Sequence, residues 1–190
     1  TALIAHPHGV GTFIEAGLIF MITWWMYDGY VGMTSNLRIE RTQYRLLMLG
    51  GMIGFFQMAL SVPTAFTTGT KGFGVGLLMA AVAHMMLLSR TYQVPGRSVT
   101  YLAPTNLSIA LLVLASGFLP EAWRVPIWAV AAAVLLIRLI TFIVFPTQRE
   151  VVYSLSPTHF IERHGLILMI ALGESIVAVG TSASGDGQML

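Results

Sequence analysis

The sequence has no cysteine and little charge. Because none of its 190 residues is cysteine, disulfides, thiolate metal sites and cysteine nucleophiles are excluded. Charged residues make up 9% of the chain, against roughly 25% in soluble domains. The net charge is +2 and the ten basic residues are scattered, so the clustered basic surface that binds nucleic acid is not expected. We therefore expect neither cysteine chemistry nor a nucleic-acid partner.

Long apolar runs take the place of the missing charge. Hydrophobic residues make up 56% of the chain, and stretches of about 20 apolar residues match the roughly 30 Å hydrocarbon thickness of a bilayer. Such runs predict helices, because a helix satisfies its own backbone hydrogen bonds in lipid. The sequence thus predicts an all-α fold, one polytopic transmembrane bundle of about six helices. The expected spans are 10–35, 45–66, 72–93, 101–119, 124–146 and 162–183.

Basic residues are divided unequally between the two sides of this predicted bundle. The connectors after the first, third and fifth spans, with their flanks, carry seven, whereas the opposite side carries two. The positive-inside rule places the seven in the cytoplasm and both ends of the chain outside. This external start, with Thr1 in place of Met, leads us to expect a piece of a longer polytopic protein. The seven are Arg38, Arg41, Arg45, Arg90, Arg97, Arg149 and Arg163, opposed by Lys71 and Arg124.

Small residues recur at helical spacing in the second and third spans. Gly50 and Gly54 are four residues apart, as are Gly72, Gly76 and Ala80. Small residues at this spacing let helix backbones approach closely in lipid. We expect these faces to pack helices within the bundle. Association of two copies through them, giving a homo-oligomer, is the alternative.

Four ionisable residues lie deep inside the predicted spans. Each costs on the order of 3 kcal/mol at the bilayer centre and therefore needs a partner or a function. At a rise of about 1.5 Å per residue, Asp28, His84 and Arg138 lie roughly 12–14 Å from the cytoplasmic boundary. Glu174 lies about 18 Å from the same side. We predict a buried polar layer, which serves as a structural network, a pathway for protons or ions, or a catalytic site.

No metal or cofactor motif fits the sequence. His159, Glu162 and His164 approach the inverted zinc-protease pattern, which needs its second histidine four residues after the first. The spacing here is five, which turns the second ring about 140° around a helix. We therefore expect no metal, no cofactor and no catalytic residue of a known pattern.

Two stretches carry more specific motifs. Residues 159–180 read HFIERHGLILMIALGESIVAVG, with the pattern H-x-x-E-R-x-G-L followed by L-G-E-S-I-x-A-x-G. Residues 24–27 read WWMY, and Asn36 follows. Both stretches resemble the bacterial low temperature requirement A (LtrA) family. The motif residues are Trp24, Trp25, Asn36, His159, Glu162, Arg163, Gly165, Gly173, Glu174 and Gly180.

The resemblance implies a multi-pass protein of the bacterial cytoplasmic membrane without assigned chemistry. It covers about residues 12–180, and it implies further helices before and after this region. Ion or small-solute translocation through the buried polar layer is the leading functional hypothesis. The alternative is an integral membrane enzyme or stress-related lipid-modifying protein, with Glu174 and His84 as acid-base groups. We favour enzymatic activity less than translocation. A structural or sensing component is the third. The expected partners are membrane lipids and an unidentified solute or ion.

Overall fold

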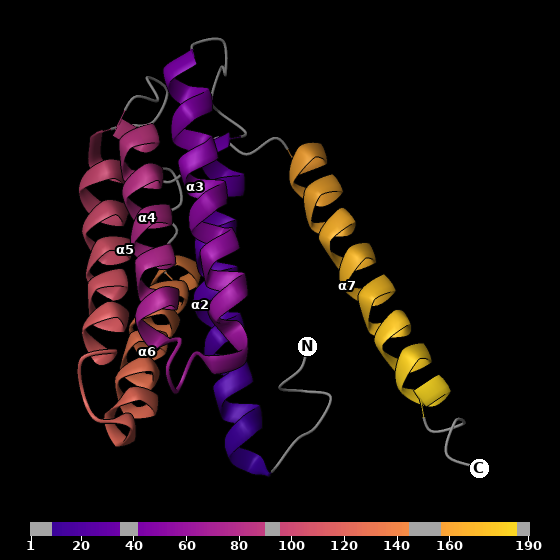
Figure 1. Ribbon diagram of the computed structural model, residues 1–190. Coiled ribbons are helices and arrows are strands. Elements are labelled where there is room, and N and C mark those ends of the chain that lie inside the picture. Colours follow the sequence, from indigo (N-terminus) through magenta and orange to yellow (C-terminus); the bar gives the residue numbers. More distant parts are fainter. Residues whose placement is uncertain (1–8, 35–41, 90–95, 145–156, 186–190) are drawn as a thin grey trace.

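The computed structural model describes residues 9–34, 42–89, 96–144 and 157–185. These residues form six long α-helices, two short 3-10 helices and no strand, which confirms the all-α prediction. Figure 1 shows that successive helices run in opposite directions. The long helices are α2 (Val10–Thr34), α3 (Thr42–Ser61), α4 (Thr70–Ser89), α5 (Gly96–Ser116), α6 (Arg124–Val144) and α7 (Pro157–Gly185). The short ones are η1 (Val62–Thr64) and η2 (Glu121–Trp123).

Four segments are long and apolar enough to cross a membrane. They are Val10–Thr34, Thr42–Thr64, Thr70–Ser89 and Glu121–Thr141. Among the described residues, α5 and α7 contain shorter apolar segments, Pro104–Ser116 and His164–Val177. Both helices start five residues before the expected spans, since backbone hydrogen bonding continues where the side chains turn polar. The chain is thus a helical membrane protein, and crossing by α5 and α7 stays a prediction.

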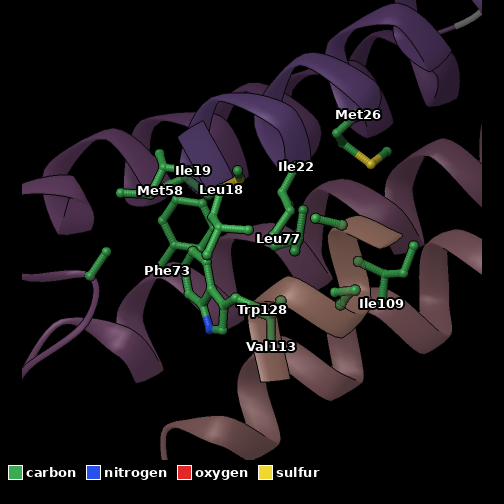
Figure 2. Packing of buried hydrophobic residues seen from close by; sticks show 14 of the residues in the cluster. Leu18, Ile19, Ile22, Met26, Met58, Phe73, Leu77, Ile109, Val113 and Trp128 are labelled. Carbon is green, nitrogen blue, oxygen red and sulfur yellow. The ribbon is translucent and has the colours of Figure 1, made fainter. Parts of the chain in front are cut away.

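Helix α4 lies at the centre of the bundle and packs against α3 and α5. Figure 2 shows side chains of α2, α4, α5 and α6 meeting in the core. Trp128 of α6 is fully buried there, with its ring centroid 4.6 Å from that of Phe66 and 4.8 Å from that of Phe73. Its indole N–H donates to the hydroxyl of Ser116 at 3.0 Å. A buried tryptophan therefore keeps its polar atom satisfied, as an apolar core requires.

The predicted small-residue faces lie between α3 and α4. A Cβ added at Gly54 would come within 2.6 Å of the Gly76 carbonyl oxygen, and one added at Gly76 within 2.6 Å of the Gly54 carbonyl oxygen. Gly54 also faces Ala80, whereas a Cβ at Gly50 would meet nothing within 4 Å. The two backbones touch where the glycines face each other, so this face is used for packing inside the chain.

Helix α7 is peripheral. Figure 1 shows it standing beside the other helices, and its contact with the bundle is made with α2. Most of its described side chains are exposed, unlike those of α4. The exposed apolar ones are Ile161, Leu166, Leu168, Met169, Ile170, Leu172, Ile176 and Val177.

Candidate functional site

The segment WWMYDGY of α2, residues 24–30, contacts the core and several other helices from different sides. Successive residues of an α-helix point about 100° apart, so a run of seven covers the whole circumference. Met26 is buried in the core. Other contacts go to α7 from Trp24, Tyr27 and Asp28, to α5 from Trp25, and to α4 from Gly29 and Tyr30. Tyr30 also packs against Phe55 of α3.

Trp25 begins a buried hydrogen-bond network. Its indole N–H donates to the Asn106 side-chain oxygen at 3.1 Å, and the Asn106 amide nitrogen lies 3.5 Å from Nδ1 of His84. An indole can only donate, so the amide oxygen must face Trp25 and the NH2 group must face His84. Nδ1 of His84 is then the acceptor, which places the proton of a neutral imidazole on Nε2. The network thus selects one tautomer of His84.

The other edge of His84 packs against α2. Its side chain is 1% exposed, and a Cβ added at Gly29 would lie 3.3 Å from Nε2. The imidazole therefore occupies the space that a side chain at position 29 would need. Tyr30 flanks the ring at 5.3 Å between centroids and donates its hydroxyl hydrogen to the Ala80 carbonyl at 2.8 Å. These contacts fix the position of α2 on α4.

Arg138 joins the same layer from α6. Its guanidinium donates to the hydroxyl of Thr105, which precedes Asn106 in α5 and is also buried. His84 and Arg138 are therefore connected through adjacent residues of α5. The layer thus draws polar side chains from α2, α4, α5 and α6 into an apolar bundle.

A second polar cluster joins α2 to α7. Nε2 of His164 lies 3.4 Å from Oδ1 of Asp28, and the His164 ring centroid is 5.7 Å from those of both Trp24 and Tyr27. The three α2 residues are spaced i, i+3 and i+4, so they share one face of the helix. The side chain of His164 is 16% exposed and that of Asp28 is 50% exposed. We call Trp24, Tyr27 and Asp28 the α2 cage.

The four residues of the predicted polar layer occupy three places. His84 and Arg138 lie in the network around α5. Asp28 points toward α7, and Glu174 is exposed on α7, ten residues beyond His164. Depth could be counted along each span, but the direction around each helix depends on tertiary packing. A layer that joins all four stays a prediction.

The connecting residues Thr105, Asn106 and His164 are not among the residues that the sequence predicts for the site. Thr105 and Asn106 are uncharged, so the cost of placing ionisable groups in a membrane does not single them out. His164 lies inside an apolar helix, and this position alone marks it as a group that needs a partner. The signal that could have found Asn106 is the indole of Trp25, which must donate a hydrogen bond when buried.

The motif residues are described to different extents. Trp24 and Trp25 contact α7 and α5, as set out above. Glu162, Gly173 and Glu174 are exposed, Gly165 is half-buried, and a Cβ at either of these glycines would meet nothing within 4 Å. The structure describes the helical backbone of His159, Arg163 and Gly180 in α7 but not their surroundings. Asn36 lies outside the described residues.

Comparison with known proteins identifies the family. The family described as bacterial low temperature requirement A protein (LtrA) matches residues 1–189. The chain is also similar to the uncharacterized protein RA0937 of Rhizobium meliloti (strain 1021), with 29% identity over 191 residues. This match covers 93% of the chain but 45% of that protein, so the chain spans less than half the length of its relative. No solved structure matches. The family match over nearly the whole chain, on a fold of membrane-spanning helices, shows that this protein belongs to the bacterial LtrA family.

Proposed function

We propose that this protein translocates a small ion or solute across the bacterial cytoplasmic membrane, along the junction between α2 and α7. The observation that carries the proposal is the pair formed by Asp28 and His164, which joins two apolar helices. An ionisable side chain inside a membrane helix costs on the order of 3 kcal/mol, so its presence needs a partner or a function. Asp28 has a partner and yet keeps half of its side chain exposed.

The two polar clusters suit different tasks. In the His84 network the histidine is buried against Gly29, and Asn106 bonds Trp25 on one side and faces His84 on the other. Such a network favours a fixed scaffold. At the α2–α7 junction a half-exposed carboxylate faces a histidine on a peripheral helix, so the contact can open without disturbing the core. Movement of α7 relative to α2 is therefore the step that we assign to translocation.

The acid-base alternative has less support. Its two groups, His84 and Glu174, lie in different settings, one buried at α4 and the other exposed on α7. The network already uses Nδ1 of His84, and Nε2 faces the backbone of Gly29. Neither nitrogen is presented to a substrate in this arrangement.

Lipid is the partner that the proposal assigns to the outer surface. The exposed apolar side chains of α7 and α3 would face acyl chains, as those of a membrane bundle do. The glycine face of α3 and α4 is filled within the chain, so a homo-oligomer would use another surface.

The test is flux in proteoliposomes that contain the full-length protein. Proton movement is followed with an internal pH dye, and small cations are screened by electrical recording on a solid-supported membrane. Asp28→Asn should reduce flux at least about tenfold, because it removes the charge of the pair while keeping its shape. Glu15→Gln, which removes the other carboxylate of α2, is the matched control and should leave flux unchanged.

Two outcomes contradict the proposal. One is wild-type flux in the Asp28→Asn protein, and the other is the absence of flux for protons and for every screened cation with the wild-type protein.

A further inference from the structure

The α2 cage has a defined shape that comes from one helix. The ring centroids of Trp24 and Tyr27 are 5.8 Å apart with their planes at 51°, and Phe20 extends the aromatic row at 5.4 Å from Trp24. Asp28 lies four residues beyond Trp24, on the same face of the helix. All these residues belong to α2, so the backbone spacing of the cage does not depend on α7.

The chemistry of the α2 cage suits a cation. Aromatic faces attract positive charge within about 6 Å of the ring centroid, most strongly for tryptophan, and cages of this kind recognise ammonium ligands. The carboxylate of Asp28 adds a counter-charge on the same face of α2. Asp28 and His164 are also potential metal ligands, but the described residues bring no third His, Asp or Glu to form a metal site. The aromatic component therefore favours an organic ammonium ion over a coordinated metal ion.

The imidazole of His164 occupies the position that an ammonium ligand of the α2 cage would take. Its ring contacts both aromatic rings and the carboxylate at once, and an imidazole becomes a cation when it is protonated. The neighbouring α7 side chains Ile161 and Met169 are exposed and therefore contribute little to holding α7 against the α2 cage. Half of the Asp28 side chain is exposed, so the carboxylate is not enclosed by the described residues.

We propose that the α2 cage is a binding site for a small ammonium cation, and that His164 of α7 occupies it as an internal ligand. An arriving cation displaces the imidazole and releases α7 from α2. The site holds whether or not the protein moves the ligand across the membrane, so a failure of the flux test leaves it standing.

The experiment is a binding titration with the full-length protein in nanodiscs. Tetramethylammonium chloride replaces sodium chloride at constant ionic strength, and tryptophan fluorescence reports binding because Trp24 forms a wall of the α2 cage. Wild-type protein should bind with saturation. His164→Ala and His164→Gln should each lower the apparent Kd by about tenfold, the gain expected if the imidazole fills the site for nine-tenths of the time.

Variants of the α2 cage should act in the opposite direction. Trp24→Leu and Asp28→Asn should each raise the apparent Kd at least about tenfold. Trp123→Leu removes an exposed indole in η2, outside the α2 cage, and should leave the apparent Kd at its wild-type value. Calorimetric titration of the same proteins checks the Trp24 variant without relying on its fluorescence.

The source of the ammonium group is tested by changing the lipid. Replacing part of the phosphatidylglycerol in the nanodiscs by phosphatidylethanolamine raises the apparent Kd if a lipid headgroup is the natural ligand, and leaves it unchanged if a free solute is. Both results support a binding site for an ammonium group in the α2 cage. The proposal is overturned if wild-type protein and both His164 variants bind with the same Kd, if neither variant binds, or if binding survives in Trp24→Leu and in Asp28→Asn.

Discussion

The two described histidines of the membrane helices have opposite surroundings. His84 is almost completely buried, faces a neutral amide and lies against the backbone of a neighbouring helix. His164 faces a carboxylate and two aromatic rings on the outer side of α2. The first ring is enclosed by the core and held by side chains of α2 and α5, whereas the second lies between a peripheral helix and a half-exposed carboxylate. The difference teaches that a histidine in an apolar helix is assigned a role by its partners, not by its depth.

The largest expected effect tests whether α4, the helix that carries His84, is held in a rigid scaffold. Gly76→Leu would place a side chain against the Gly54 carbonyl and should lower the free energy of unfolding by about 3 kcal/mol. Gly50→Leu is the control, because its side chain would enter open space, and it should change stability by less than about 0.5 kcal/mol. Unfolding of the full-length protein by sodium dodecyl sulfate in mixed micelles measures both. Equal effects would show that α3 and α4 do not pack through these glycines.

The two histidines can be compared directly. His84→Ala leaves a cavity and an unpaired Asn106 NH2 group, so it should cost about 2 kcal/mol in the same unfolding measurement. His164→Ala removes a ring from a peripheral helix and should cost less than about 1 kcal/mol. A larger loss for His164→Ala than for His84→Ala would reverse the assignment of scaffold and movable contact.

The adjacent tryptophans give the smallest and sharpest test. Trp25→Phe keeps an aromatic ring but removes the donor to Asn106, so stability should fall by about 1 kcal/mol. Trp24→Phe keeps a ring in the α2 cage and should change stability by less than about 0.5 kcal/mol. The order is measured by the same unfolding titration. A larger loss of stability for Trp24→Phe than for Trp25→Phe would contradict the assignment of the Asn106 hydrogen bond to Trp25.

The sequence was sufficient for the helices and for one packing face. Long apolar runs predicted six helices, and glycine spacing predicted the close approach that Gly54 and Gly76 make. The partner of Asp28 could not be predicted, because its direction depends on which helix packs against that side of α2. The same reason explains Glu174: α7 contacts the bundle at α2, and its side chain ten residues beyond His164 is exposed.

The resemblance to the LtrA family marked residues that physical reasoning from the sequence did not select. The family motifs marked residues 24–25 and 159–180 without indicating that they belong together. The structure brings them into contact, because Trp24 packs against His164, the residue between Arg163 and Gly165 of the second motif. The motif itself leaves that position unspecified, so the family pattern alone would not have selected His164.

The full turn of contacts around residues 24–30 has a consequence for how this segment can change in evolution. An ordinary surface helix has one conserved stripe and one free side, so a small rotation costs it little. Here a rotation of α2 by one residue, about 100°, would carry the α2 cage, the Trp25 donor and the Gly29 gap away from their partners together. An insertion or deletion inside α2 just before this segment would therefore disturb all of these contacts at once, whereas a single substitution disturbs one of them.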